Sequence, residues 1–509
     1  MAPANFLLVF TLLCSLQIFS GGIALENQNN SPEAMIFEAC DKIENQNACL
    51  SNLHSRLEDR VGRRTPTSVF QAALENTLDE ARSAIDTLTK VTSLSISYRE
   101  QIAIDDCKEL LDFSVSELAW SLDEMKRVRA GFKNEQSEGN LKAWLSAALS
   151  NQDTCLEGFE GTDRHLENFV RGSLKQVTQL IDFPKWMTDG DKELLVSSPK
   201  GMHADAIVAL DGTGRYRSIN QAILEAPSYS NRRYVIYVKK GVYQEHIDLK
   251  KKTTNIMLVG DGIGATVITG NRNFMQGWTT FRTATVAVSG KGFIARDITF
   301  RNTAGPQNHQ AVALRVDSDQ SAFYRCSMEG YQDTLYAHSL RQFYRECSVY
   351  GTIDFIFGNG AAVLQNCKIF TREPLPLQKV TITAQGRKDP HQSTGFSIQD
   401  SYVYATKPTY LGRPWKQYSR TVFMKTYMSG QVQPRGWLEW YGNFALSTLW
   451  YGEFKNYGPG ALTSGRVRWP GYHIITDASV ASFFTVRRFI DGLSWLPATG
   501  IKFSSGLTN

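Results

Sequence analysis

The sequence lacks the features expected of a metalloprotein, a cofactor-dependent enzyme or a nucleic-acid-binding protein. The glycine-rich run at 260–270 is followed by no helical pattern, so turns explain it better than a phosphate-binding loop does. A net charge of +5 over 509 residues is too diffuse for a nucleic-acid surface. The histidines beyond residue 200 lack metal-ligand spacing and lie at His203, His246, His309, His338, His391 and His473. We therefore expect no metal, no cofactor and no nucleic-acid partner.

Long apolar runs are also missing, apart from one at the N-terminus. The run from Phe6 to Phe19 is too short to span a bilayer comfortably, and small residues up to Ala24 offer a signal-peptidase site. Because no charged side chain precedes the run, an uncleaved anchor is the alternative. We expect residues 1–24 to be a signal peptide and the mature protein to be secreted, with no membrane contact.

Cysteine is scarce, and its count is uneven after the signal peptide. Of eight cysteines, Cys14 would leave with residues 1–24. An odd number then remains, so at least one should stay unpaired in an oxidising compartment unless it bonds between chains. The remaining seven are Cys40, Cys49, Cys107, Cys155, Cys326, Cys347 and Cys367.

Residues 25–183 lack the glycine and β-branched runs that come later. The segments 68–90, 98–127 and 140–149 carry apolar residues at spacings of three and four, with many good helix formers. A helical bundle is the simplest architecture. Its cysteines are placed to brace it: Cys40 and Cys49 are close enough to pin a hairpin, and Cys107 and Cys155 would tie two helices together.

The chain changes character after residues 184–203, which read as a linker. From Ala204 onwards, short β-branched apolar runs alternate with Gly, Asn and Asp turns. Most of these runs are too close together for crossover helices, so a right-handed parallel β-helix fits better than a doubly wound sheet. Residues 481–493 would form a C-terminal helix that covers one end. A right-handed parallel β-helix is thus the all-β fold predicted for residues 204–509.

Within that region one stretch repeats. Phe-Tyr-Arg at 323–325 recurs at 343–345, and if Glu346 is an inserted residue the offset then becomes 21. Asp333 then matches Asp354. Units of this length predict a solenoid in which each unit is one coil stacked on the last. Matching residues of stacked parallel strands lie about 4.8 Å apart, so the two aspartates should be neighbours.

Two neighbouring carboxylates suggest acid–base or nucleophilic chemistry. Like charges about 5 Å apart repel by about 3 kcal/mol at an effective dielectric of about 20, which moves one pKa up by about two units. One aspartate then stays protonated while the other is ionised. The alternative is that both are turn residues bonded to local backbone amides.

The N-terminal cysteines carry a resemblance. Their placement in EACDKIENQNACL, IDDCKELL and NQDTCLEGF resembles the plant invertase and pectin methylesterase inhibitor domain. The resemblance implies an all-α four-helix bundle over 25–183 with two disulfides; a bundle that only assists folding or export is the alternative. In that family a basic RRLL-like linker sequence is cut by a subtilisin-type protease. Here Glu193 breaks the basic pair, which argues against cleavage.

The second region resembles the plant pectin methylesterases over nearly all of 204–509. The motifs that carry the resemblance occur in the family's order, as GVYQEHI, QAVAL, GYQDTLY, DFIFG, LGRPW and GPGALTSGRVRWPGY. The resemblance implies a cofactor-free esterase that removes methyl groups from homogalacturonan in the plant cell wall. The inhibitor-like domain would then contact the catalytic domain of its own chain or of another.

The resemblance also implies a role for each site residue. Asp354 would attack the C6 carbonyl of a methylated galacturonate, while Asp333 would protonate the methoxide and then activate water. Gln310 and Gln332 would stabilise the oxyanion. Arg413 would hold Asp354 ionised. The alternatives are a stacked amide ladder for the two glutamines and a turn role for the arginine.

Substrate binding would fall to other residues. The same resemblance implies that Trp415 and Thr280 bind the sugar chain. An aromatic face suits the apolar side of a pyranose. The alternative for Trp415 is an ordinary packed ring. Trp437 and Trp440 either line the same groove or belong to the core.

The sequence departs from the family pattern at two points. The segment between Tyr404 and Tyr410 is shorter than usual before LGRPW, which trims a loop near the site. Ser401 stands where some members have a cysteine paired with the equivalent of Cys367. We therefore expect Cys347 to pair with Cys367 and Cys326 to stay free.

Two rival functions remain. A β-helix glycosidase or lyase would act on the same polymer, since paired carboxylates also serve glycoside hydrolysis. In a non-catalytic wall-binding or inhibitory protein, the first domain would act and the second would only anchor. Intact Asp333, Asp354 and Arg413 favour the esterase.

Overall fold

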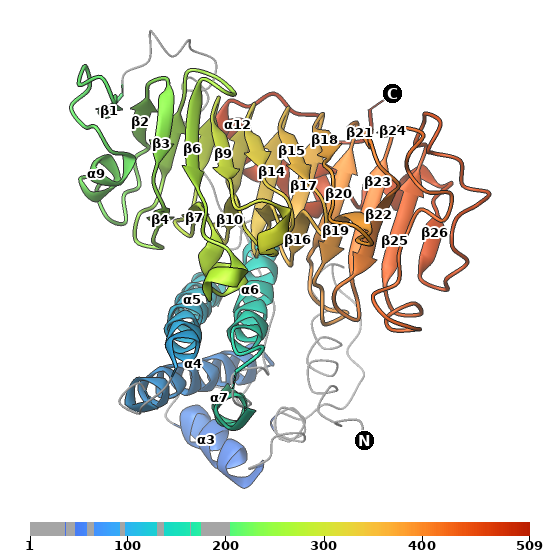
Figure 1. The fold of residues 1–509 in the computed structure, drawn as a ribbon. Helices are drawn as coiled ribbons and strands as arrows, with labels where there is room; N and C mark the ends of the chain where they lie inside the picture. Colours follow the sequence, from blue (N-terminus) through green and yellow to red (C-terminus); the bar gives the residue numbers. More distant parts are fainter. Residues whose placement is uncertain are drawn as a thin grey trace. The chain divides into compact units, whose positions relative to one another are not determined.

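The computed structural model describes residues 36, 46–58, 66–91, 97–129, 137–162, 164–174 and 204–508. The chain divides into two compact units between Lys185 and Trp186, inside the predicted linker. We call them the helical unit and the β-helical unit (Figure 1). The predicted signal peptide, Cys40 and the linker with Glu193 lie outside the described residues.

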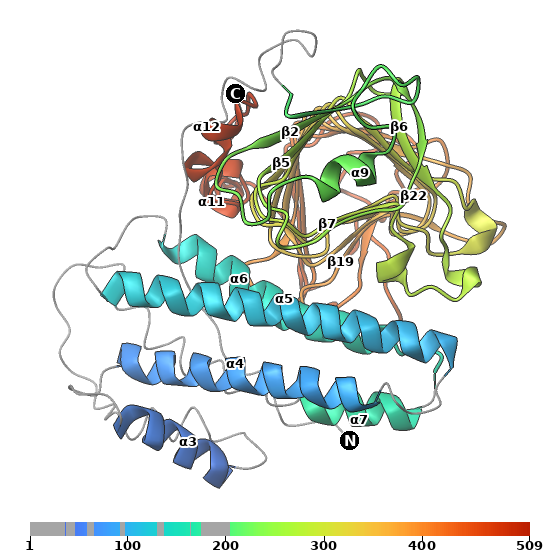
Figure 2. The same cartoon turned by 90° about the vertical axis from the view of Figure 1, so that its left-hand side faces the viewer.

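The helical unit is held together by packing between its helices. Helix α5 packs against both α4 and α6, and α7 packs against the same two helices, which closes a four-helix bundle (Figure 2); α3 packs on α4. The predicted all-α four-helix bundle is confirmed. Cys107 and Cys155 form the predicted disulfide, which joins α5 to α6. The described helices are α3 (Gln46–Glu58), α4 (Pro66–Val91), α5 (Tyr98–Arg129), α6 (Ser137–Glu157) and α7 (Arg164–Leu174).

The β-helical unit consists of three long parallel sheets, and from β2 to β22 each coil contributes one strand to each sheet. Sheet A contains β1 (Ala206–Val208), β2 (Tyr234–Val238), β5 (Ile256–Val259), β8 (Ile294–Arg296), β11 (Ser321–Tyr324), β14 (Arg341–Arg345), β17 (Ala361–Gln365), β20 (Gly395–Gln399), β23 (Arg420–Met424), β25 (Trp450–Phe454) and β26 (Tyr472–Ile474). Sheet B contains β3 (Gly241–Gln244), β6 (Thr266–Gly270), β9 (Thr299–Asn302), β12 (Ser327–Glu329), β15 (Ser348–Gly351), β18 (Lys368–Thr371), β21 (Tyr402–Tyr404) and β24 (Tyr427–Met428).

Sheet C carries the candidate site. It contains β4 (Ile247–Leu249), β7 (Val286–Val288), β10 (Leu314–Val316), β13 (Leu335–Tyr336), β16 (Ile356–Gly358), β19 (Val380–Gln385) and β22 (Thr409–Pro414). Apolar side chains from all three sheets point into the coils and form one continuous core. The predicted parallel β-helix is confirmed.

The repeat runs at a constant offset of 21, not at 20 followed by an insertion. Strand β11 pairs with β14 so that Phe323 lies opposite Tyr344, and their rings stack 4.9 Å apart. Arg325 and Glu346 occupy equivalent left-handed corners, with φ of 49° and 55°. The interpretation of Glu346 as an inserted residue was therefore wrong. The Phe-Tyr-Arg match misled because the inward-facing positions accept either aromatic ring.

The two ends of the unit are covered differently. Helix α9 (Ile219–Leu224) buries its apolar face in the core next to β1, β2 and β4, and lies across the N-terminal end of the stack (Figure 2). We predicted that a helix at residues 481–493 would cover one end of the stack, and this was wrong. The C-terminal segment instead packs along the outer face of sheet A. That face is apolar from β2 to β17 and needs a cover. The segment forms α10 (Ala478–Ser482), α11 (Val486–Phe489), η7 (Gly492–Ser494) and α12 (Leu496–Thr499).

The predicted disulfide between Cys347 and Cys367 is wrong, because both thiols are free and buried, as is Cys326. In-register parallel strands hold these side chains about 4.8 Å apart and pointing the same way, whereas a disulfide needs Cβ atoms about 3.8 Å apart. Each thiol instead donates to a carbonyl of the coil before it, Cys347 to Phe323 and Cys367 to Tyr344, both at 3.4 Å. The expectation that Cys326 stays free is confirmed.

Candidate active site

Two aspartates occupy the corners that lead into neighbouring strands of sheet C. Asp333 precedes β13 and Asp354 precedes β16, with φ of 64° and 50°. Because β13 and β16 pair with Leu335 opposite Ile356, the two carboxylates stand at matching positions of successive coils. The predicted juxtaposition is confirmed. Left-handed backbone is uncommon outside glycine, although Asp is among the residues that tolerate it.

Asp354 is held from two directions. The Arg413 guanidinium lies across its carboxylate, with Nε 2.9 Å from Oδ1 and Nη2 2.5 Å from Oδ2. On the other side, the Thr381 hydroxyl donates to Oδ1 at 2.6 Å. Asp354 is only 5% exposed. Such charge-assisted, bidentate contacts are strong and fix the orientation of the carboxylate. The Asp354 and Arg413 side chains thus bind each other and do not serve as simple turn residues.

Asp333 has the opposite environment. Its side chain is buried, and its carboxyl group has no hydrogen-bond partner among the described residues. Burial raises the pKa of Asp333 well above its ordinary value, the nearby negative charge of Asp354 raises it further, and Arg413 only partly opposes this. The site therefore combines a carboxylate paired with a guanidinium and a buried carboxyl group whose raised pKa favours its protonated form, which is the combination required of a nucleophile and a general acid.

Both predicted oxyanion residues lie near this pair along the chain. Gln332 directly precedes Asp333, and its carbonyl accepts from the Ala311 amide at 3.3 Å, next to Gln310. Both glutamines are half-buried, and neither side-chain amide has a hydrogen-bond partner in the described part of the chain. The amide ladder considered as the alternative for these two glutamines is not formed among the described residues. An amide pair occurs elsewhere, on the outer face of sheet A, where Gln365 donates to Gln399 at 3.3 Å and to the Ser504 carbonyl at 2.9 Å.

Aromatic rings flank the charged centre. The Arg413 guanidinium stacks on Trp440, 4.2 Å from the ring centroid. Trp415, two residues after Arg413, lies half-buried beside Phe357, with 5.8 Å between centroids. Trp437 is fully buried and stacks on Tyr451 at 4.2 Å, so it belongs to the core. The two tryptophans left undecided by the sequence therefore separate, and only Trp440 reaches the site.

Thr280 lies on a different coil from the aspartates. It begins a short 3-10 turn, η5 (Thr280–Thr283), where its carbonyl accepts from the Thr283 hydroxyl at 2.7 Å. The turn comes shortly before β7, towards the β4 end of sheet C. It is half-buried.

Sequence reasoning missed Thr381. This residue on β19 also accepts from the backbone amide of Asp354 at 3.0 Å, so one hydroxyl fixes both the corner and the carboxylate. Extending the repeat by one more coil would have pointed to it. The signal was hidden because β19 pairs with β16 at an offset of 27, the intervening loop having lengthened the coil.

Comparison with known proteins decides the family. The sequence model of the Pectinesterase family matches residues 205–493, which include every residue of the site described above. The chain belongs to the pectinesterase family. A second family, plant invertase/pectin methylesterase inhibitor, matches residues 34–183, the helical unit.

Relatives from the pectinesterase family match nearly the whole chain. Pectinesterase/pectinesterase inhibitor 22 of Arabidopsis thaliana is 62% identical over 94% of both chains. Pectinesterase/pectinesterase inhibitor PPE8B of Prunus persica is 50% identical over 86% of this chain and 89% of that one. Pectin methylesterase from carrot has a solved structure with a TM-score of 0.60 and 54% identity, matched over 61% of this chain and all of its own.

Neither metal ligation nor membrane insertion finds support in the described residues. No group of three or more His, Cys, Asp or Glu side chains in the described ranges is placed to hold a metal ion. None of the described helices is both long and apolar enough to cross a membrane.

Proposed function

We propose that this pectinesterase-family chain hydrolyses the methyl esters of homogalacturonan, with Asp354 as nucleophile and Asp333 as acid and base. One observation carries the proposal: Arg413 neutralises Asp354, while Asp333, one coil away, is buried without a counter-charge of its own. The two adjacent carboxyl groups thus have different surroundings, and each suits one step of an acyl transfer: a carboxylate beside a guanidinium for the attack, and an acid with a raised pKa for the proton transfer.

In the first step, a carboxylate oxygen of Asp354 attacks the C6 carbonyl carbon of a methylated galacturonate unit. The carbonyl oxygen gains negative charge, which the free amide donors of Gln310 and Gln332 stabilise. One preorganised donor of this kind contributes about 3 kcal/mol. The C6–O bond to the methoxy group then breaks, Asp333 gives its proton to the departing oxygen, and methanol leaves.

In the second step, the ionised Asp333 takes a proton from water. The hydroxide equivalent attacks the acyl carbon, the bond to Asp354 breaks, and the product leaves as galacturonic acid, which loses its proton to the solvent. Asp354 is again ionised and Asp333 again protonated, so the cycle closes without a cofactor. Arg413 and Thr381 keep the Asp354 oxygens in place throughout.

The sugar chain would lie along the outer face of sheet C. Trp415 offers an aromatic face beside the reaction centre, and Thr280 marks the groove on the coils towards β4. Trp440 stacks on the Arg413 guanidinium and so limits its movement.

The location and processing of the chain follow from its sequence. We propose that the protein is secreted into the plant cell wall after cleavage behind Ala24, and N-terminal sequencing of the secreted protein should then begin at Leu25. We further propose that Glu193 keeps a subtilisin-type protease from separating the two units. The variant Glu193→Arg should be cut in the linker where the wild type is not; equal cleavage of both would contradict this.

The helical unit should act on the catalytic unit. Because it belongs to the inhibitor family by its match over 34–183, we expect added residues 25–183 to lower methanol release by residues 197–509. Unchanged release at a large excess of the helical unit would reject an inhibitory role and favour a role in folding or export.

The function is tested by methanol release from highly methylated pectin. Wild-type protein, as the full chain and as residues 197–509, is compared with the same proteins carrying Asp354→Ala. Release that disappears in the variant establishes both the reaction and its nucleophile. Shortening of the polymer without methanol would point to a glycosidase or lyase. Binding of pectin with neither product would point to a wall-binding protein.

A further inference from the structure

The outer face of sheet B changes character along the unit. Its strands alternate inward residues of the core with outward ones. Arg301 and Glu329 face outward at one position of successive coils and pair at 2.8 Å. Further along the same row the side chains are aromatic, so the sheet itself does not require aromatic rings at this position. The row runs from β6 to β21 through Thr269, Arg301, Glu329, Tyr350, Phe370 and Tyr404.

A neighbouring row ends in three tyrosines. Tyr402 on β21 lies opposite Tyr427 on β24 (Figure 1), and Tyr427 forms a bridge with Tyr457 in the next coil. We call Tyr402, Tyr404, Tyr427 and Tyr457 the tyrosine cluster. Tyr402 is 37% exposed, Tyr404 36% and Tyr457 50%, whereas Tyr427 is half-buried. A small molecule in solution can therefore reach the cluster.

The rings of the cluster contact one another. Tyr402 and Tyr404 are nearly parallel, with 6.1 Å between their centroids. Tyr427 lies 6.1 Å from Tyr404, 6.4 Å from Tyr402 and 5.7 Å from Tyr457. Phe370 borders the cluster, stacked 5.1 Å from Tyr404. Because a phenylalanine has no hydroxyl group, phenol chemistry along this face stops at Phe370.

Tyr402 and Tyr457 approach each other through their hydroxyl groups. Burial raises the pKa of Tyr457 above its ordinary value, and the Tyr402 hydroxyl, with which it shares a hydrogen bond, raises that pKa further. The Tyr457 hydroxyl therefore keeps its proton at neutral pH. The ring carbons ortho to the two hydroxyl groups are next to the atoms that meet, so these carbons are neighbours as well.

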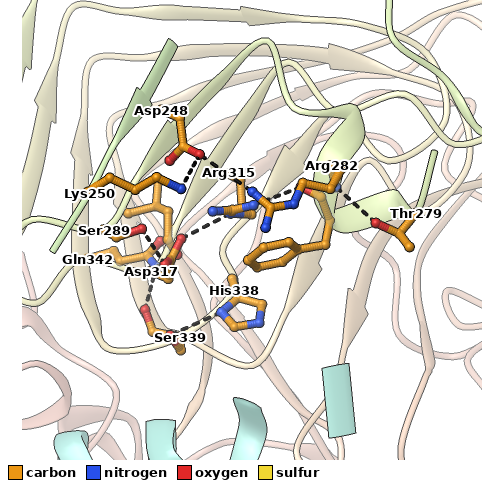
Figure 3. A network of polar contacts seen from close by, with 12 residues as sticks. Asp248, Lys250, Thr279, Arg282, Ser289, Arg315, Asp317, His338, Ser339 and Gln342 are labelled. Carbon is orange, nitrogen blue, oxygen red and sulfur yellow. Dashed lines mark hydrogen bonds and ion pairs between the residues drawn. The ribbon is translucent and has the colours of Figure 1, made fainter. Parts of the chain in front are cut away.

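Sheet B is thin at this end. In the middle of the unit, buried side chains connect successive coils: Figure 3 shows Asp317, just after β10, accepting from Ser289, just after β7, at 2.6 Å and from Arg315 at 3.1 Å. In contrast, β24 contains only two residues, and Tyr427 pairs with Tyr457 through an isolated bridge. A covalent bond across the tyrosine cluster would add a connection where the backbone ladder is short.

We propose that Tyr402 and Tyr457 form an oxidative modification site, at which a carbon–carbon bond joins them into a dityrosine cross-link within one chain. The oxidant is hydrogen peroxide, activated by a haem peroxidase that acts on the exposed phenols. Tyr404 and Tyr427 pack around the pair and hold the two rings at the surface. The cross-link forms whether or not the protein hydrolyses pectin.

The reaction removes two hydrogen atoms from the protein. Each tyrosine gives one proton and one electron to the activated oxidant and becomes a phenoxyl radical. One carbon ortho to each oxygen then contributes an electron to the new carbon–carbon bond. The hydrogen atoms on these two carbons move to the oxygens, which restores both phenols. One molecule of hydrogen peroxide is reduced to two molecules of water.

The cross-link closes a loop that carries part of the candidate active site. Arg413 and Trp440 lie between Tyr402 and Tyr457 in the sequence, and Arg413 holds the Asp354 carboxylate. A covalent link between distant residues restricts the unfolded chain and so favours the folded one. We therefore expect the oxidised protein to resist unfolding of the coils that bring Arg413 to Asp354.

The test treats the purified full-length protein, at low concentration, with hydrogen peroxide and a haem peroxidase, and with hydrogen peroxide alone as the blank. Peptide mapping by mass spectrometry then identifies peptides joined with the loss of two hydrogen atoms. The variants are Tyr402→Phe and Tyr457→Phe, which keep the ring and remove the hydroxyl group. The control is Tyr229→Phe, because Tyr229 is 75% exposed but contacts no other ring in the described part of the chain. Thermal unfolding verifies the folding of each variant.

We expect the wild type and the control to yield a peptide pair that joins Tyr402 to Tyr457, in a protein that still runs as a single chain on a denaturing gel. Both cluster variants should lose this pair. The oxidised wild type should unfold at a higher urea concentration than the blank, and oxidised Tyr402→Phe should show no such shift. Cross-links only between chains, no cross-link, or a pair that joins Tyr457 to another tyrosine would overturn the site.

Discussion

Arg413 and Asp354 lie 59 positions apart in the sequence, and Arg413 comes from a strand two removed from that of Asp354, yet the guanidinium covers both carboxylate oxygens. Coil stacking brings them together, because each coil shifts the chain by one strand spacing. The same stacking places Asp333 on the other side of Asp354. Asp354 thus has the Arg413 guanidinium towards one end of the sheet and the buried Asp333, whose pKa is raised, towards the other.

Replacing Arg413 by lysine tests the orienting role of that contact. A lysine supplies a single charge instead of a planar fork, so the carboxylate is no longer held at both oxygens. We expect kcat for methanol release to fall about 100-fold, with KM little changed, since small misplacements of a reacting group cost about that much. Arg435→Lys, at an exposed pair with Glu439, should leave kcat unchanged. A wild-type kcat in Arg413→Lys would contradict the role.

The pH dependence of the reaction should follow Asp333. Burial and the charge of Asp354 raise its pKa well above the ordinary value, and the first step needs its protonated form. The kcat/KM for methanol release should therefore persist above the ordinary pKa of about 3.9 and fall as the pH rises through the raised value. The measurement is a pH profile of initial rates. A profile that falls as pH drops towards 5 and stays flat at high pH would be inconsistent with Asp333 as the acid.

The raised pKa of Asp333 also predicts how stability depends on pH. Its contribution falls as the pH rises, which is opposite to that of an aspartate whose pKa is lowered by folding. Between the ordinary and the raised pKa, the folded protein binds the Asp333 proton and the unfolded chain does not. The contribution of this group to the free energy of unfolding therefore decreases as the pH rises through that window. Asp333→Asn removes the titration, so the variant should gain stability relative to the wild type as pH rises. Urea unfolding at several pH values measures this; a constant difference would speak against a raised pKa.

The sequence was informative where the repeat and the strand register coincide. Asp333 and Asp354 follow glycines at matching places, Gly330 and Gly351, so an offset of 21 could be found without a structure. The Phe-Tyr-Arg match at offset 20 was misleading, because core positions such as Phe323 select for size and apolarity and not for identity. Repeats of core residues therefore fix the register less firmly than corner residues do.

Other features needed three dimensions. Thr381 could not be assigned because the loop before β19 changes the coil length. The Cys347–Cys367 pairing looked plausible from adjacent coils, but it depends on an ångström of Cβ separation that sequence spacing does not reveal. The packing of the C-terminal segment on sheet A could not be predicted either. It depends on an apolar outer face, and the periodicity of a strand cannot distinguish its outer face from its inner face when both are buried.

Thr381→Val isolates the effect of the hydroxyl on Asp354. The substitution keeps the shape and removes both bonds to Asp354, at 2.6 Å to the carboxylate and 3.0 Å from the amide. We expect kcat to fall about tenfold and stability to drop by about 1–3 kcal/mol, since the amide loses its partner. Thr383→Val on the same strand is the matched control. Its hydroxyl bonds the Leu411 carbonyl, so stability should fall while kcat stays. Equal kcat in both variants would remove Thr381 from the site.

The two neighbouring tryptophans should separate activity from stability. Trp437 is fully buried, and its indole N–H donates to Glu453 at 3.3 Å, so Trp437→Ala should cost about 3–5 kcal/mol of stability. Trp440→Ala should change stability little and lower kcat, because Arg413 loses the ring on which it stacks. Chemical denaturation and methanol release, measured on the same preparations, test the pair. Loss of stability in both with no specific loss of kcat in Trp440→Ala would place Trp440 in the core as well.

The cysteines offer a test of the coil geometry itself. Alkylation of the denatured, unreduced protein, followed by peptide mapping, should modify Cys326, Cys347 and Cys367 and leave Cys107 and Cys155 unmodified. In the native protein the three thiols should resist alkylation, because all are buried and each thiol with a described bond donates to a backbone carbonyl. Reducing agent should then leave the β-helical unit as stable as before and lower the stability of the helical unit by about 2–4 kcal/mol, through the 48-residue loop that Cys107 and Cys155 close. If Cys347 and Cys367 were not alkylated in the denatured, unreduced sample, they would form a disulfide. The coils would then approach each other more closely than parallel stacking allows.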